Sequence, residues 1–389
     1  MNSEILNPEF QQYLQSIEKE NPQRFSLKKS PFPTISSAEI AQQVKGKQVA
    51  QHKFPSLYAT PGIYYPPSVN LEQASSELTA NYKATIVKGK KLIDLTAGFG
   101  IDCYAFAQNF GEVTHVEQNK ELSQIVAANA KTLGLNIKCY HGTFQEYFIE
   151  NSHEKFDCIY LDPARRDAGG RKFILEDLEP NILDYLDEYW QKTDQILLKL
   201  SPLLDISSTI HQLQHAKEIH IVAVKNEVKE MLVKLDKFYL GNNPEIVCIN
   251  LKTKQDIFKY RFEDEPVADI NYTDSLHYIY SPNASILKAG AFKLVGKKFN
   301  LSKLHQNTHL YTSDLLIEEF PGKIYEVIKI ITQPKKELLS MKVNSIAKNF
   351  NQPIDVLKKK YKLIDGGENT LIFCRTFSGF QIFLTKRIR

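Results

Sequence analysis

The stretch Lys91-Leu-Ile-Asp-Leu-Thr-Ala-Gly-Phe-Gly-Ile-Asp102 decides how this chain is expected to fold. Its apolar start, Leu92 to Leu95, predicts a short buried strand that runs into a glycine-containing turn and then a helix. Gly98 and Gly100 let a ligand approach the backbone, because a glycine has no Cβ. Such a turn lies at the carboxyl end of a parallel strand, where the next helix begins with unpaired N–H groups. The stretch therefore predicts a ligand site.

Apolar strand-like segments and helical patterns alternate after this turn. Strands are predicted at 113–116, 137–140, 156–161, 195–200 and 218–224, and helices at 120–133, 144–149, 175–190, 207–215 and 227–235. This alternation, with continuous apolar strands, predicts an α/β fold whose mostly parallel sheet is covered by helices on both faces. A terminal strand pair is expected at 245–251 and 257–262.

The composition along the chain predicts four parts. These are a helical N-terminal region (1–68), the alternating domain (69–254), a small α/β domain (255–318) and a terminal α/β domain (319–389). In the first part, helices are expected at 10–19 and 37–51. The third part has its clearest helix at 283–298. For the last part the prediction is a strand at 323–331, helices at 343–349 and 354–360, and strands at 370–375 and 380–386.

The whole-chain composition is that of a soluble globular protein, with 389 residues, 42% hydrophobic and 24% charged. No apolar run approaches the roughly 18 residues that span a membrane. The N-terminus lacks the features of a signal peptide. The five cysteines are scattered and form no C-x-x-C pair, which argues against a zinc site or an iron–sulfur cluster. We therefore expect a cytoplasmic protein without a metal.

The charge is unevenly distributed. Residues 319–389 contain 14 Lys/Arg and 6 Asp/Glu, a balance of +8, whereas the whole chain carries only +4. A basic terminal domain favours a polyanionic partner, with nucleic acid first. A solvated lysine-rich face is the alternative.

Two ligands commonly use a glycine turn of this kind. Dinucleotide enzymes need a third glycine, but position 103 is a cysteine, and Asp102 would direct a negative charge at a pyrophosphate. Acidic residues at Asp94 and Asp102 instead suit a ligand that carries a cation. S-adenosylmethionine has both an ammonium and a sulfonium group. The charge pattern therefore favours this methyl donor over NAD.

The next two strand ends also suit a nucleoside. Glu117 ends the second strand, where a carboxylate accepts hydrogen bonds from both ribose hydroxyls. After the third strand, Thr143 and Phe144 would place backbone groups and an aromatic edge near an adenine. The predicted donor site comprises Asp94, Thr96, Ala97, Gly98, Gly100, Asp102, Glu117, Gln118, Thr143, Phe144 and Asp162.

A helix is expected to lead directly to the glycine turn. Asn70 and Gln73 resemble a capping box, and apolar residues recur at helical spacing as far as Ile86. Gln73, Ser75 and Ser76 would lie in its first turn, where free N–H groups and hydroxyls hold an anion or a carboxylate of the substrate. Plain helix capping is the alternative.

The fourth strand ends in Asp162-Pro163-Ala164-Arg165, where a methyl acceptor would meet the donor. Asp162 and Pro163 are the predicted catalytic residues, with Asp162 orienting the acceptor. Basic side chains follow in a glycine-containing loop and are expected to hold nucleic-acid phosphate: Arg165, Arg166, Arg171 and Lys172. A surface loop with chance basic residues is the alternative.

Covalent catalysis by cysteine is not expected. Cys158 lies inside the fourth strand, four residues before Asp162, and should be buried. Radical chemistry needs a cluster of cysteines, which the sequence lacks. The remaining mechanism is direct in-line transfer of the methyl group. In this mechanism the protein mainly positions the acceptor.

The chain resembles the class I S-adenosylmethionine-dependent methyltransferases, and more closely a bacterial family of them with a THUMP-like C-terminal domain. Strings over nearly the whole chain carry the resemblance: 71–84, Asp94 to Asp102, Leu161 to Asp167, Lys225 to Glu230, Tyr280 to Gly290 and Asn307 to Asp314.

The resemblance implies a Rossmann-like methyltransferase domain, a ferredoxin-like middle domain and a THUMP-like end. THUMP domains are associated with RNA, so methylation of rRNA or tRNA is implied. Two departures are notable. Asn351 replaces a proline of the family, and Ala164-Arg165 replaces the proline and stacking aromatic found after Asp/Asn-Pro in N-methyltransferases. A protein or small-molecule methyltransferase, or a non-catalytic RNA-binding protein, are the alternatives.

Overall fold

The computed structural model describes residues 1–26, 28–165 and 175–389. Of the predicted phosphate-holding residues, Arg166, Arg171 and Lys172 lie outside the described residues, and Arg165 is described by its backbone alone. The chain divides into two compact units. The first contains Met1–Ala216 and Val233–Leu240, and the second contains Lys217–Leu232 and Gly241–Arg389.

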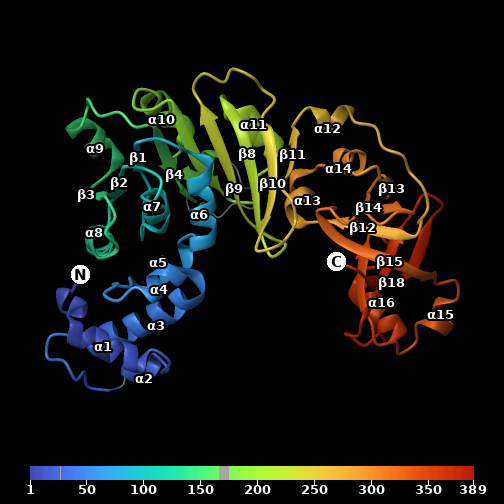
Figure 1. Cartoon of the computed structure of the whole chain (residues 1–389), viewed down its shortest axis with the longest axis horizontal. Coiled ribbons are helices and arrows are strands. Elements are labelled where there is room, and N and C mark those ends of the chain that lie inside the picture. Colours follow the sequence, from blue (N-terminus) through green and yellow to red (C-terminus); the bar gives the residue numbers. More distant parts are fainter. Residues whose placement is uncertain (27, 166–174) are drawn as a thin grey trace. The chain divides into compact units, whose positions relative to one another are not determined.

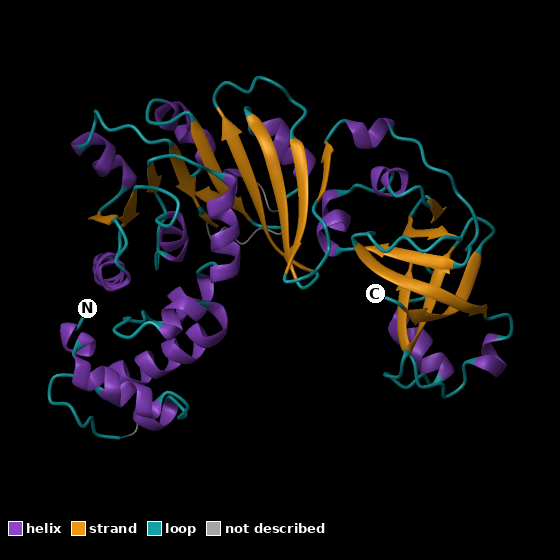
Figure 2. Cartoon of the chain, viewed as in Figure 1, coloured by secondary structure: helices purple, strands orange, loops and turns teal. Residues whose placement is uncertain are grey.

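The first unit begins with a run of helices, as Figure 2 shows. They are η1 (Ser3–Leu6), α1 (Pro8–Ile17), α2 (Gln23–Ser26), α3 (Ser37–Lys53), α4 (Pro55–Ala59) and α5 (Ser68–Gln73). α3 starts at a capping box formed by Ser36 and Glu39. Phe10, Leu14 and Val44 are buried, because these helices pack their apolar faces together. The helices predicted at 10–19 and 37–51 are confirmed.

Within the described residues, the first sheet has nine strands in the order β11-β10-β8-β9-β7-β4-β1-β2-β3 (Figure 1). The strands are β1 (Lys91–Asp94), β2 (Glu112–Glu117), β3 (Ile137–His141), β4 (Cys158–Leu161), β7 (Gln195–Leu200), β8 (Ala216–Val224), β9 (Glu227–Asp236), β10 (Glu245–Leu251) and β11 (Phe258–Arg261). β1 pairs in parallel with β2 and with β4, so the strand order reverses at β1. Ligands of such sheets bind at this switch point, beyond the carboxyl ends of the strands.

Helices connect these strands, as the α/β prediction requires. They are α6 (Glu77–Ile86), α7 (Ile101–Phe106), α8 (Lys120–Leu133), α9 (Phe144–Glu150), α10 (Ile182–Trp190) and α11 (Ile206–Gln212). The bounds of α8 agree with the prediction because both ends carry sequence signals. Asn119 caps its first turn, and Gly134 ends it in the left-handed conformation.

Three elements of this region differ from the prediction. The single helix expected after Asn70 is two helices, and Ser76 caps the second by accepting a hydrogen bond from the Thr79 N–H. The helix expected at 175–190 begins only at Ile182. It is preceded by η2 (Leu175–Asp177) and the short strand β6 (Leu178–Glu179), which pairs with β5 (Ala164–Arg165).

The helix expected at 227–235 is the strand β9. A two-residue turn at Lys225 and Asn226 (φ 49° and 69°) joins it to β8. Two successive positive φ angles are the mark of a type I′ hairpin turn, which holds the flanking strands together. The apolar run Met231–Val233 is buried, as a strand inside a sheet requires.

The second sheet lies entirely in the second unit, with the order β13-β14-β12-β15-β18-β17-β16 among the described residues. Its strands are β12 (Tyr278–Pro282), β13 (Ser302–His305), β14 (Thr308–Ser313), β15 (Gly322–Ile330), β16 (Asn344–Lys348), β17 (Asn369–Arg375) and β18 (Phe380–Arg387). The accompanying helices are α12 (Asp264–Val267), α13 (Ala284–Ala289), α14 (Leu294–Lys298), α15 (Pro334–Glu337) and α16 (Ile354–Tyr361).

Two predictions fail in this unit. The helix expected at 283–298 breaks into α13 and α14, because Gly290 ends α13 with φ +78°. The helix expected at 343–349 is the strand β16, which pairs in parallel with β17. The sheet takes strands from both sides of residue 318, and the boundaries of the four predicted parts stay predictions.

Across the described ranges, no helix combines the length and the hydropathy needed to cross a bilayer.

Candidate active site

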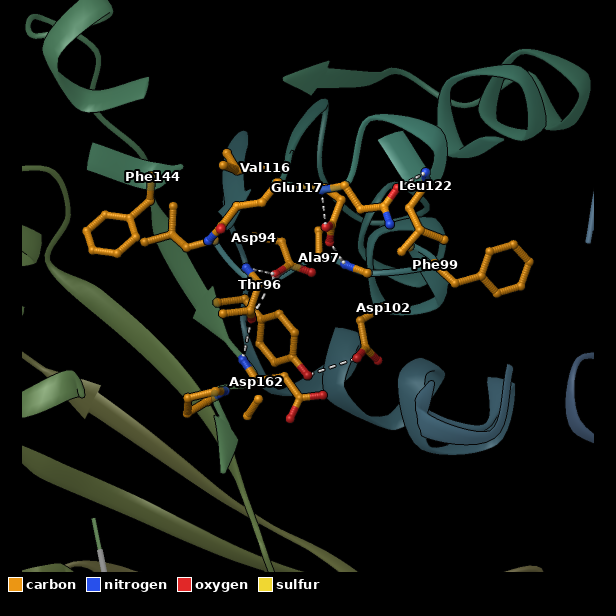
Figure 3. Close-up of a pocket in the computed structure, with 18 of the residues that line it drawn as sticks. Asp94, Thr96, Ala97, Phe99, Asp102, Val116, Glu117, Leu122, Phe144 and Asp162 are labelled. Carbon is orange, nitrogen blue, oxygen red and sulfur yellow. Dashed lines mark hydrogen bonds between the residues drawn. The ribbon is translucent and has the colours of Figure 1, made fainter. Parts of the chain in front are cut away.

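A cavity of about 1060 Å³ opens at the carboxyl ends of β1 and β4 (Figure 3). All eleven predicted donor-site residues line it, namely Asp94, Thr96, Ala97, Gly98, Gly100, Asp102, Glu117, Gln118, Thr143, Phe144 and Asp162. Pro163, Gln73 and Ser75 also line it, whereas Ser76 is not among its lining residues. The strand ends thus bring together side chains that are far apart in the sequence.

The β1 turn contains glycine at two positions, Gly98 and Gly100, and the structure explains each by a different cause. At Gly100 (φ +75°) a Cβ would come within 2.8 Å of Cγ1 of Val126, so α8 could not pack as it does. At Gly98 (φ +53°) a Cβ would meet no protein atom within 4 Å. The open space beside Gly98 belongs to the cavity, which is where a ligand could approach the backbone.

Asp94 organises the turn from the end of β1. Its Oδ1 accepts a hydrogen bond from the Thr96 N–H at 3.0 Å, and its Oδ2 lies 3.4 Å from Sγ of Cys103. Burial raises the pKa of Asp94 to about 8, with a smaller contribution from the Asp102 carboxylate, while the Thr96 hydrogen bond opposes the rise. A cation placed beside Asp94 would favour its charged form.

His115 supports the turn from β2. Its Nε2–H donates to the Gly98 carbonyl oxygen at 3.1 Å. Burial lowers the pKa of His115 to about 4, so the ring is neutral at physiological pH.

Glu117, at the end of β2, is fixed by two backbone groups. Its Oε2 accepts from the Gly98 N–H at 2.9 Å, and its Oε1 accepts from the Asn119 N–H at 2.7 Å. Each carboxylate oxygen keeps a second lone pair, so both can still accept a hydroxyl. The carboxylate is therefore held in one orientation with two positions open for a diol.

Phe144 and Thr143 form the wall after β3. Thr143 caps α9 in a capping box with Glu146, which places Phe144 in the first turn. The Phe144 ring is buried against Tyr185 and Tyr189, with ring centroids 5.0 and 5.6 Å away. Aromatic packing thus gives this side of the cavity a firm apolar wall.

Asp102 is the centre of a buried polar cluster that the sequence did not indicate. Its Oδ2 accepts hydrogen bonds from Ser75 Oγ at 2.8 Å and from Tyr160 Oη at 2.9 Å. Its Oδ1 lies 3.0 Å from Nζ of Lys83, whose side chain is fully buried. Burial alone would raise the pKa of Asp102, but the ammonium groups of Lys83 and Lys199 and the Ser75 hydrogen bond lower it below its ordinary value. Asp102 is thus an ionised carboxylate with its partners inside the chain.

Asp162 lies at the end of β4 and pairs with Lys199 of β7, an ammonium that the sequence analysis missed. The Lys199 Nζ is 2.5 Å from the Asp162 Oδ2, and the Asp162 N–H donates to Thr96 Oγ1 at 2.6 Å. A single lysine in the apolar strand Gln195–Leu200 was the available signal. Thr96 thereby links the β1 turn to the end of β4.

The entrance beside Asp162 is framed by the β5–β6 pair. Ala164 pairs with Glu179 and Arg165 with Leu178. Ala164, Glu179 and Pro180 line the cavity next to Pro163. The backbone on both sides of residues 166–174 is therefore tied together at the cavity edge.

The charges of the lining suit a cationic ligand. Among the described lining residues are five carboxylates, those of Asp94, Asp102, Glu117, Asp162 and Glu179, and one ammonium, that of Lys199. Cys158 is fully buried, as predicted, and burial raises the pKa of its thiol to about 12, which leaves no thiolate nucleophile here. In the described ranges, no group of three or more His, Cys, Asp or Glu side chains is placed to hold a metal ion.

Comparison with known proteins supports this picture. Residues 72–181 match the family described as conserved hypothetical protein 95, and residues 278–321 match a ferredoxin-like domain, which confirms the domain expected in that part of the chain. An uncharacterised S-adenosylmethionine-dependent methyltransferase of Mycobacterium tuberculosis (strain CDC 1551 / Oshkosh) is 20% identical over 268 residues, which are 69% of this chain and 70% of that protein.

A crystal structure from Porphyromonas gingivalis W83 is similar over almost the full length. That protein, assigned as a methyltransferase, is 32% identical, with 97% of each chain covered and a TM-score of 0.89. The chain therefore belongs to the class I S-adenosylmethionine-dependent methyltransferases, in the same family as the Porphyromonas gingivalis protein.

Proposed function

We propose that this enzyme transfers the methyl group of S-adenosylmethionine to RNA by direct in-line displacement. The single observation that carries the choice of acceptor is the balance of +8 in residues 319–389 of a chain whose total is +4. RNA is a polyanion, and lysine and arginine side chains that neutralise its phosphates supply most of non-specific affinity. The resemblance to the family with a THUMP-like C-terminal domain supports the same choice, and whether the RNA is rRNA or tRNA stays open.

The donor half of the site follows from the geometry of the strand ends. S-adenosylmethionine supplies an activated methyl group on its sulfonium. Glu117 would accept the ribose hydroxyls, and the Phe144 wall would cover the adenine. The acidic lining would balance the donor's positive charges, with Asp94 nearest the β1 turn. Gln73 and Ser75 would hold the donor's or the substrate's polar groups at the neighbouring edge.

The acceptor half would be built on Asp162. The Lys199 ammonium keeps one oxygen of this carboxylate in place, and the other oxygen can accept a hydrogen bond from an amino group. Pro163 would hold the following backbone carbonyl toward the same group. The protein then contributes mainly position and orientation, because the methyl group is already activated.

The basic residues after β4 would hold the RNA backbone. Arg165, Arg166, Arg171 and Lys172 follow the acceptor residues in sequence, and such side chains fix the register of a nucleic acid through its phosphates. We place the enzyme in the cytoplasm, where RNA substrates are found. The five cysteines are free, which suits a reducing compartment.

The test is incubation of the purified chain with labelled S-adenosylmethionine and with fractionated RNA, DNA and protein from a strain that lacks it. Label is expected in RNA and strongly reduced with the Asp162→Ala variant. Label that appears only in protein would overturn the RNA proposal.

A protein or small-molecule acceptor is the second candidate. It is favoured by the loss of the stacking aromatic of the familiar motif, because Ala164-Arg165 follows Pro163. The same fractionation decides between the candidates.

A further inference from the structure

A second hollow, of about 520 Å³, lies in the second unit beside β15, β18 and α16. Its lining includes the aromatic side chains of Phe350, Tyr361 and Phe380. The amides of Asn351 and Gln352 and the ammonium of Lys360 line it as well. The described lining contains no acidic side chain. A hollow with aromatic faces, amides and one cation has the chemistry of a nucleotide site.

The aromatic part of this hollow is open to solvent. The Phe380 side chain is 49% exposed, which is unusual for a ring of this size. Its ring centroid lies 5.2 Å from that of Phe350, which in turn packs at 5.5 Å on Phe373 of the buried core. The guanidinium of Arg375 lies 5.7 Å from the centroid of the Phe380 ring. Phe380 is therefore a supported ring on which a base could stack.

The charge around the hollow favours an anionic occupant over an apolar peptide. Lys360 closes the last turn of α16, where Lys358 and Lys359 precede it. The Lys360 Nζ lies 5.3 Å from the centroid of the Tyr361 ring, so the ammonium stands beside the aromatic lining. A phosphate bound at Lys360 would place its base toward the rings.

We infer that this hollow binds an unpaired nucleotide of single-stranded RNA. The base stacks on Phe380, which Phe350 supports edge-on, and its phosphate pairs with Lys360. The inference rests on the proposed function, because it takes the polyanion to be RNA, and it adds a binding site separate from the cavity at β1 and β4.

The experiment uses the full chain and a single-stranded RNA octamer with one 2-aminopurine. Binding is followed by anisotropy, and stacking by quenching of the 2-aminopurine. Phe380→Ala is expected to weaken binding about tenfold, the size of one lost base stack, and to abolish quenching. The matched control is Phe377→Ala. Phe377 is 70% exposed in the adjoining turn and is not among the lining residues, so its loss should leave both readings unchanged.

The contact between Lys360 and the phosphate is tested separately. Lys360→Gln should lower the slope of log affinity against log salt by about 0.7, the value for one phosphate of a single strand. Lys359→Gln makes the same charge change at an exposed neighbour outside the lining and should lower it less. Thermal unfolding of each variant checks that the fold is kept.

The outcomes separate this inference from the proposed function. If RNA is methylated but Phe380→Ala binds it like the unaltered chain, the hollow is not the nucleotide site and the acceptor proposal stands. Equal affinity for an octamer with abasic sites in place of its bases would mean that only phosphate is held, and the inference would fail. Binding of no RNA, together with label only in protein, would overturn both.

Discussion

The ends of β1 and β4 lie side by side in the sheet, yet their charged groups are satisfied in different ways. Beyond β1, Asp102 is 8% exposed and finds Ser75, Lys83 and Tyr160 inside the chain. At the end of β4, the Asp162 side chain is 33% exposed and pairs with Lys199, its one charged partner among the described residues. The first region is complete before a ligand arrives, whereas the second leaves an oxygen for a substrate to use. This difference fits the roles proposed above, in which the first region holds the donor and the second meets the acceptor.

The largest effect on stability is expected at Asp102 and its buried partners. Lys83→Met should lower the free energy of unfolding by about 3–5 kcal/mol, because Asp102 would be left as an uncompensated buried charge. Denaturant unfolding followed by circular dichroism measures the loss. The matched control is Lys91→Met, whose ammonium is 43% exposed and lies 3.5 Å from Glu112, and which should cost about 1 kcal/mol or less. Equal losses of unfolding free energy in the two variants would show that the Asp102 cluster stabilises the fold no more than a surface ion pair does.

Substitution of Asp162, at the end of β4, should instead affect the rate of methyl transfer. Asp162→Ala is expected to lower methyl transfer about 10²–10³-fold, within the range for one positioned acid–base or orienting group. Calorimetric titration with S-adenosylmethionine should give a dissociation constant within about threefold of the original. Normal transfer by this variant would mean that the acceptor binds elsewhere. Loss of donor binding would mean that the two regions are not separable.

Lys199→Met tests whether the ammonium that pairs with Asp162 is needed for methyl transfer. Without the ammonium the Asp162 carboxylate is free to rotate, so we expect kcat to fall about tenfold. The Lys199 side chain is 16% exposed, and the stability loss should be smaller than for Lys83→Met. Lys199→Arg, which keeps the charge, should recover part of kcat. A fall in donor affinity with unchanged kcat would instead assign Lys199 to the donor side.

The smallest effect concerns pH at the donor side. Asp94, with its pKa raised to about 8, is largely protonated at pH 7, and a bound cation favours its carboxylate form. Donor binding should therefore release a proton below pH 8, and affinity should rise with pH and level off above about 8. Titrations in two buffers of different ionisation enthalpy measure the proton. Asp94→Asn should remove the pH dependence, and proton uptake on binding would contradict the assignment. His115, neutral in this range, is not expected to contribute.

The raised pKa also sets the pH dependence of folding for the free chain. Because the folded pKa of Asp94 lies above the ordinary value of 3.8, its contribution to stability is full in acid and is lost as pH rises toward 8.

The parts of the fold that could be predicted are those with local signals. The β1 turn, α8 and β7 were found because apolar runs, a cap or glycines mark them. β9 and β16 were expected to be helices, because residues such as Glu, Lys, Met and Ala suit a helix. Their pairing partners decide otherwise, and for β16 the partner is β17, more than 20 residues further along the chain. Strand identity there depends on long-range pairing, which local periodicity does not contain.

The residues of the candidate site also fall into those that the sequence predicted and those that it did not. The acidic and glycine positions could be read from the ends of predicted strands, since parallel strands bring those ends together. Lys83 and Tyr160 gave no signal, because a lysine on a helix and a tyrosine in a strand are ordinary. Their value comes from meeting Asp102, whose partners lie 19 and 58 residues away in the chain.

The β5–β6 pair has a consequence for how this enzyme could change its substrate. It pairs Ala164 with Glu179, so the two ends of the connection between them lie together beside the cavity. Longer or shorter inserts between these two anchors cost little in chain entropy. Under the proposed function, a change of length or sequence between these two anchors would alter the acceptor side and leave the residues proposed to bind the donor unchanged.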